Sequence, residues 1–99
     1  MFIAYSTFIV ANDKSDEVKQ AFRERPHLVD GQPGFLKMEI ISPLERLQEI
    51  HVITYWTDEA SFKAWHKSPA FHKSHKKVPK GLKVVPFQAK LHFFEHISS

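Results

Sequence analysis

The strongest constraint on the fold is the order in which strand-like and helix-like segments follow one another. Residues 2–10 are β-prone, and their side chains alternate between two faces that are both largely apolar. A helix with Asp13 or Ser15 as its N-cap is predicted next. It ends near Arg25, because Pro26 cannot continue it.

The middle of the chain predicts a hairpin. Residues 27–34 contain two glycines and a proline and read as a connecting loop. Two β-prone segments follow, at 35–41 and 50–56, separated by Ser42-Pro43 and a polar turn. Strands joined by so short a connection pair antiparallel.

The second half begins with another helix and ends in a strand. Asp58 is the predicted N-cap of this helix. Ser68 followed by Pro69 matches a second helix start, so a kinked continuation is predicted through Lys77. Residues 87–95 then form the last strand.

The resulting order is β-α-β-β-α-β, which is the ferredoxin-like arrangement of the α+β class. It predicts one domain over residues 1–99, with an antiparallel sheet and both helices on one face. The other sheet face stays apolar whichever set of alternating side chains it carries, so it needs a cover. A second copy of the chain packed sheet to sheet would provide one, and a homodimer is therefore expected.

Composition narrows the class of protein. The chain has no cysteine, which excludes disulfides, thiolate metal sites and a cysteine nucleophile. No apolar run approaches the roughly 20 residues that span a membrane, and the N-terminal residues do not resemble a signal peptide. We therefore expect a cytoplasmic protein with no membrane partner.

Charge is distributed unevenly. Residues 1–59 carry six Lys or Arg and ten Asp or Glu, whereas residues 60–99 carry eight Lys and a single acid, Glu95. A basic half indicates an anionic partner or a solvated Lys-rich surface. The predicted strands lack an RNP-like basic and aromatic motif, so nucleic acid is not an expected partner.

Residues 56–75 hold the most informative motif, W-T-D-E-A-S-F-K-A-W-H-K-S-P-A-F-H-K-S-H. It brings a helical Trp65, the imidazoles of His72 and His75, and adjacent lysines into one short region. A flat anionic ligand such as haem needs these groups: an imidazole for the iron, apolar rings for the macrocycle and cations for the propionates.

This pattern resembles a known family. Trp56 is followed at set distances by further aromatic, Ser and His positions: Phe62, Trp65, Ser68, Phe71 and His75. Together with the element order and the length, they resemble the antibiotic-biosynthesis-monooxygenase-like (ABM) domains. More narrowly, the chain resembles the IsdG-type haem-degrading monooxygenases, and the resemblance covers nearly all of it.

The resemblance implies a set of site residues. His75 matches the axial ligand of the haem iron, and Trp65 matches the residue that crowds the porphyrin. Ser6 aligns with an active-site Asn of the family, a departure that leaves a shorter donor. His72 lies about one turn before His75 and is the rival ligand. Phe71 and Lys76 complete the expected haem-binding residues.

The function implied is oxidative opening of haem, which serves as both substrate and cofactor, with electrons from an external donor such as a reductase. Two alternatives remain open. The first is a cofactor-free monooxygenase of the same fold, acting on an aromatic or quinol substrate. The second is a haem-binding protein without catalysis, consistent with Ser6 in place of Asn.

Overall fold

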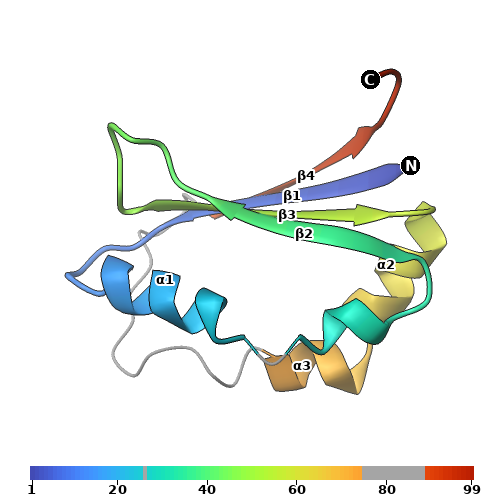
Figure 1. Ribbon diagram of the computed structural model, residues 1–99, viewed down its shortest axis with the longest axis horizontal. Coiled ribbons are helices and arrows are strands. Elements are labelled where there is room, and N and C mark those ends of the chain that lie inside the picture. Colours follow the sequence, from blue (N-terminus) through green and yellow to red (C-terminus); the bar gives the residue numbers. More distant parts are fainter. Residues whose placement is uncertain (26, 75–88) are drawn as a thin grey trace.

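A computed structural model describes residues 1–25, 27–74 and 89–99 of the chain (Figure 1). The elements follow one another as β1 (Phe2–Ile9), α1 (Ser15–Arg23), η1 (Val29–Gly31), β2 (Phe35–Ile41), β3 (Glu49–Trp56), α2 (Glu59–His66), α3 (Pro69–Ser74) and β4 (Lys90–Glu95). Where the structure describes them, their bounds match the predicted segments to within a few residues. The predicted end of the second helix, at residues 75–77, and the predicted start of the last strand, at residues 87 and 88, lie outside the described residues.

The sheet has the order β2-β3-β1-β4, and all of its pairings are antiparallel. This is the ferredoxin-like order, so the predicted fold class is confirmed. The helices lie together on one face of the sheet, and in the described part of the chain the other face carries no helix (Figure 1). We call these the helix face and the open face.

The two predicted caps in the second half are present. The Asp58 carboxylate accepts a hydrogen bond from the backbone N–H of Ser61 at 2.8 Å. The Ser68 hydroxyl accepts one from the N–H of Phe71 at 3.2 Å. Each satisfies a backbone donor that the first helical turn leaves without a partner.

The predicted cap of α1 is wrong. Lys14 occupies the N-cap position and makes no side-chain capping bond. Ser15 is already the first helical residue, and Asp13 lies one residue before the cap, so neither side chain is placed to accept from the first turn. The acidic residues Asp16 and Glu17 still oppose the helix dipole favourably.

Gly34 explains how the loop reaches β2. Its φ is +79°, a conformation that glycine adopts without strain. A Cβ at this position would meet the Ser61 side chain of α2 within 2.5 Å, so the loop can pack this closely only with glycine.

The core lies on the helix face and forms two clusters. The first contains Ala4, Val29, Trp56, Phe62 and Trp65, and the second contains Val10, Val18 and Ile50. Trp56 and Ile50 are fully buried, which assigns the even-numbered residues of β1 and β3 to the helix face. Strand parity, which the sequence left open, is thereby settled.

In the described part of the chain, no helix is both long enough and apolar enough to cross a membrane.

Candidate functional site

Ser6 is the polar residue of β1 on the helix face. It lies between Ala4, which belongs to the first cluster, and Phe8, which packs against the second. Its strand neighbours are Val52 on β3 and Leu91 on β4. Within the described residues its hydroxyl has no hydrogen-bond partner, so it remains available to a bound molecule.

The helix face is apolar but uncovered beside Ser6. Leu91 and Phe93 on β4 point to this face and are 44% and 53% exposed. The Phe93 ring nevertheless contacts the rings of Phe2 and Phe62, with centroids 5.4 and 5.5 Å apart. Exposed apolar side chains therefore continue from the first cluster toward Ser6.

Trp65 forms part of the first cluster and is 6% exposed. It is thus a core residue packed among Ala4, Trp56 and Phe62. Its ring also meets Phe71 of α3 edge-on, with centroids 5.6 Å apart. The short connection at Ser68 turns the chain so that α3 packs back against α2. Trp65 and Phe71 together make an aromatic wall at the end of the helix layer.

Not all of the predicted ligand residues fall in the described part of the chain. His72 belongs to α3, the short helix that also carries Phe71. His75 and Lys76 lie outside the described residues. His66, which we did not predict as a ligand, is exposed and contacts the Phe71 ring at a tilt of 50°, with ring centroids 4.6 Å apart.

Arg25 is a candidate that sequence reasoning missed. Its side chain is only 20% exposed, and its guanidinium forms an ion pair with Asp30 of η1 at 2.8 Å. The hydrogen bond from Arg25 holds the pKa of the Asp30 carboxyl below its usual value, although burial opposes the shift. A largely buried cation such as Arg25 attracts anionic groups. No local sequence pattern indicates that Arg25 would be buried at the end of α1.

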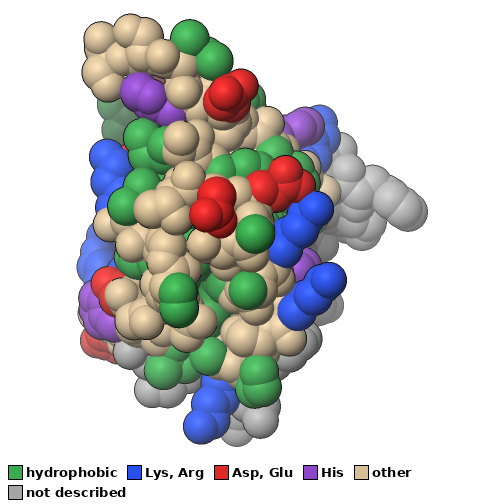
Figure 2. Space-filling view, turned by 90° about the vertical axis from the view of Figure 1, so that its right-hand side faces the viewer, with side chains coloured by type: hydrophobic (Ala, Val, Ile, Leu, Met, Phe, Trp, Pro, Cys, Tyr) green, Lys and Arg blue, Asp and Glu red, His purple; other side chains and the backbone are tan. Residues whose placement is uncertain are grey.

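A separate hollow of about 410 Å³ lies at the end of the molecule where β1 begins and β3 and β4 end. Figure 2 shows acidic side chains among apolar ones at this end. The hollow is lined by Met1, Phe2, Thr57, Asp58, Glu59, Phe93, Phe94 and Glu95. Three carboxylates would repel an anionic ligand, so this hollow does not suit haem propionates.

The open face carries a hydrogen-bonded polar network. The imidazole of His51 bonds to the Tyr5 hydroxyl and to the Glu49 carboxylate, each at 2.6 Å. The bond with His51 and a second one from Arg46 hold the pKa of Glu49 below its usual value. On the same face, a hydrogen bond with Glu39 raises the pKa of Tyr55. No three His, Asp or Glu residues in the described ranges are grouped to hold a metal ion.

The fold and the helix-face site together define an α+β domain with exposed apolar side chains beside a hydroxyl that has no partner within the described residues. The family model of the antibiotic biosynthesis monooxygenases matches residues 1–77. The chain belongs to this family. The resemblance read from the sequence is confirmed at this level.

A curated relative has a defined activity. The chain is 32% identical over 65 residues to the heme oxygenase (mycobilin-producing) of Mycobacterium tuberculosis. The match covers 64% of this chain and 62% of the relative, so it spans less than two-thirds of that protein.

Solved structures share the fold over nearly the whole chain. The heme degrader MhuD of M. tuberculosis, with two hemes bound in its active site, superposes with a TM-score of 0.80 at 24% identity and covers 100% of this chain and 98% of MhuD. SnoaB, a cofactor-independent oxygenase of Streptomyces nogalater, gives 0.77 at 17% identity and covers 99% of this chain and 94% of SnoaB. At these identities both establish the fold alone.

Proposed function

We propose that this protein is a haem-degrading monooxygenase that binds haem against the helix face and opens the porphyrin ring. The observation that carries the proposal is the Ser6 hydroxyl, which has no partner in the described part of the chain and lies beside the exposed side chains of Leu91 and Phe93. The M. tuberculosis heme oxygenase, 32% identical over 65 residues, supports the same substrate class.

The residues around the helix face include the kinds of group that haem needs. A porphyrin needs an apolar surface, which the exposed side chains of Leu91 and Phe93 on β4 offer. Its propionates need cations, for which Lys76 is the sequence prediction. Its iron needs an imidazole, for which His75 is the sequence prediction and His72 the rival.

Each residue then has a distinct role. Haem, when bound, supplies the redox-active iron and the ring that is opened. His75 holds the iron, and Trp65 and Phe71 exclude water and fix the orientation of the ring. The Ser6 hydroxyl would donate a hydrogen bond toward haem bound on the helix face, where a donor favours negative charge that develops during the reaction.

We also propose an electron donor, a cellular location and an oligomeric state. Electrons come from an external donor such as a reductase. The protein acts in the cytoplasm as a homodimer whose protomers pack through the open face, and each protomer carries its own helix-face site.

A haemin titration followed by ascorbate tests the function. We expect a shifted Soret band at one haemin per chain and progressive loss of that band once ascorbate and oxygen are present. A Soret band that stays at the position of free haemin would contradict haem binding. A shifted band that persists under ascorbate would instead identify a haem-binding protein without catalysis.

The second candidate is a cofactor-free oxygenase of an aromatic or quinol substrate. The fold likeness to SnoaB, with a TM-score of 0.77, favours it, as does the free hydroxyl in an apolar setting. Oxygen uptake with a quinol in the absence of haem would support this candidate.

A further inference from the structure

A tyrosine, a histidine and a glutamate form a hydrogen-bonded relay on the open face. The Tyr5 hydroxyl lies 2.6 Å from Nδ1 of His51, and Nε2 of the same ring lies 2.6 Å from the Glu49 carboxylate. The side chains of His51 and Glu49 are only 17% and 18% exposed. These short contacts therefore link largely buried groups of two paired strands, β1 and β3.

The carboxylate fixes the direction of the protons in this relay. An ionised carboxylate can only accept hydrogen bonds, and the bond with His51 is the main cause that holds the pKa of Glu49 below its usual value. Nε2 of His51 then carries the hydrogen of that bond. In the neutral imidazole this leaves a lone pair on Nδ1, so Nδ1 accepts from the Tyr5 hydroxyl. The phenol proton therefore points directly at a base.

A base at this position makes the phenol easier to oxidise. A phenol that loses one electron becomes a strong acid, so its oxidation is favoured where a hydrogen-bonded base takes the proton at the same time. His51 is placed to take that proton. The Glu49 carboxylate would then balance the positive charge of the imidazolium.

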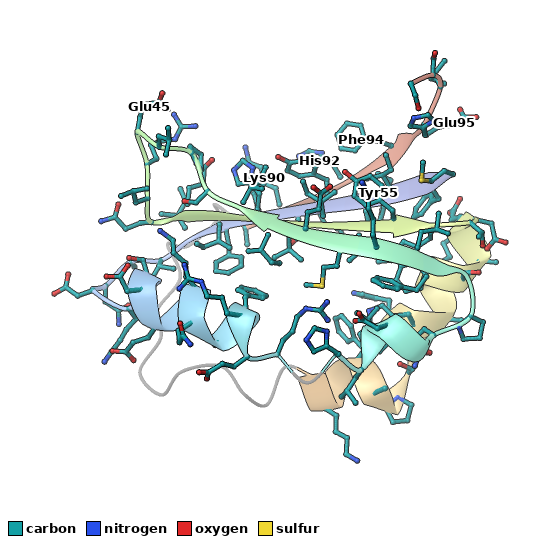
Figure 3. The ribbon with its side chains drawn as sticks, viewed as in Figure 1. Glu45, Tyr55, Lys90, His92, Phe94 and Glu95 are labelled. Carbon is teal, nitrogen blue, oxygen red and sulfur yellow. The ribbon has the colours of Figure 1, made fainter. Side chains whose placement is uncertain are left out.

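The second tyrosine of the chain has a less favourable setting. Tyr55 also lies on the side of the sheet away from the helices, as does Phe94, which contacts the Tyr5 ring (Figure 3). The Lys37 ammonium lies over the Tyr55 ring, 4.5 Å from its centroid, and its charge opposes loss of an electron from that ring. A hydrogen bond with Glu39 raises the pKa of Tyr55, so this phenol releases its proton less readily. Of the two tyrosines, Tyr5 is the better electron donor.

Tyr5 also lies close to the proposed haem site. It precedes Ser6 in β1, and consecutive residues of a strand point to opposite faces. Only the sheet itself therefore separates the phenol from the helix face. The apolar cluster on that face holds the indoles of Trp56 and Trp65, which strong one-electron oxidants attack.

We propose that Tyr5 is a redox-active tyrosine that delivers one electron to an oxidised haem centre on the helix face while its proton moves to His51. The proposal rests on the haem-binding function proposed above and adds a protective one. The oxidant is haem iron that hydrogen peroxide has oxidised. One electron passes to the haem centre, the O–H bond of Tyr5 breaks, and an N–H bond forms at Nδ1 of His51. The external electron donor then reduces the tyrosyl radical, and the proton returns. The oxidising equivalent leaves the apolar cluster, and Trp56 and Trp65 are spared.

Photochemical oxidation of the whole chain without haem tests the relay. A ruthenium polypyridyl complex and persulfate, excited by a laser flash, generate a one-electron oxidant, and transient absorbance distinguishes tyrosyl from tryptophanyl radicals. We expect a tyrosyl signal that falls severalfold in Tyr5→Phe and persists in Tyr55→Phe, the matched control on the neighbouring strand. His51→Leu should slow tyrosyl formation about tenfold or more, because the base is gone. The wild-type rate should also fall in heavy water, since a proton moves with the electron.

An undiminished tyrosyl signal in Tyr5→Phe, or a wild-type rate that is the same in heavy water, would overturn the relay even if His51→Leu does not fold. Haemin with hydrogen peroxide tests the link to the site by electron paramagnetic resonance. A tyrosyl radical in the wild type that is lost in Tyr5→Phe supports the link, whereas haemin that binds but yields no tyrosyl radical overturns it. Haemin that does not bind would overturn the haem proposal and this link together, while the ruthenium result is independent of haem.

Discussion

The two faces of the sheet are built from alternate residues of the same strands, yet they differ in how their central polar groups are hydrogen-bonded. On the open face, the Tyr5 hydroxyl and the Glu49 carboxylate both bond to His51. On the helix face, Thr54 accepts from the Trp56 indole at 2.9 Å, and Ser6 has no partner within the described residues. A polar side chain with an internal partner serves the fold, whereas one without a partner beside uncovered apolar surface is available to a ligand.

The two faces of the sheet also differ in how their apolar side chains are buried. The helix face is filled at both ends by buried clusters and is uncovered beside Ser6. The open face buries Ile53 but leaves Phe94 half exposed. We infer that the helix face takes haem and the open face takes a second protomer, and the following predictions test that division.

The largest effect is expected at the centre of the first cluster. Trp56 is completely buried on the helix face and is one of the two largest fully buried side chains. Trp56→Ala should lower the free energy of unfolding by about 3–5 kcal/mol, because it leaves a large cavity. Urea denaturation followed by circular dichroism measures this change. Leu44→Ala, at an 89% exposed position, is the matched control and should leave the protomer's stability nearly unchanged.

The next effect concerns the predicted iron ligand. His75→Ala should abolish axial ligation of haemin, whereas His66→Ala should preserve it, because the exposed His66 ring contacts Phe71 and is not the expected ligand. The Soret position of each variant with haemin distinguishes them. If the Soret band of bound haemin is unaltered in His75→Ala but returns to the position of free haemin in His72→Ala, His72 is the ligand.

A smaller effect is expected on the open face. Tyr5→Phe removes one part-buried hydrogen bond to His51 and should cost about 1 kcal/mol of protomer stability. Haemin affinity should not change, because the hydroxyl lies on the opposite side of the sheet from Ser6. Equilibrium unfolding and a haemin titration of the same protein measure both quantities. Reduced haemin affinity in this variant would break the division between the faces.

The smallest effect is a pH dependence at α2. The hydrogen bond from the Ser61 N–H holds the pKa of Asp58 below its ordinary value of 3.8. The charged cap therefore stabilises the fold above that value, and this contribution is lost as pH falls. Asp58→Asn keeps a neutral cap, so the stability difference from wild type should shrink between about pH 5 and about pH 2 in thermal denaturation. A stability difference between Asp58→Asn and wild type that stays constant across that range would contradict the role of Asp58 as a charged cap.

Much of the fold could be predicted because each element has a local signature. The alternation in residues 2–9 and the Asp58 and Ser68 caps depend only on neighbouring residues. Strand parity could not be predicted, because both sets of alternating side chains in β1 are largely apolar. It became clear only from the burial of Trp56 and Ile50.

The site residues also divide into those that local sequence predicts and those that it does not. Trp65 and Phe71 could be predicted as neighbours because they flank the Ser68-Pro69 helix start. The bond between Tyr5 and His51 joins residues 46 positions apart, and no local pattern indicates it. The Arg25–Asp30 ion pair depends on the path of the loop into η1, which the sequence marked only as irregular. The roles of Ser6 and His75 stay predictions.

The most direct test of the division uses two adjacent residues of β1 that point to opposite faces. Ser6→Glu places a carboxylate on the helix face, and Thr7→Glu places the same group on the open face beside Lys90. Haemin titration and light scattering are applied to both variants after circular dichroism confirms folding. We predict that Ser6→Glu loses haemin affinity about tenfold or more but stays dimeric, whereas Thr7→Glu weakens the dimer and keeps haemin affinity. Wild-type haemin affinity in Ser6→Glu, or an equal loss in both variants, would contradict the account.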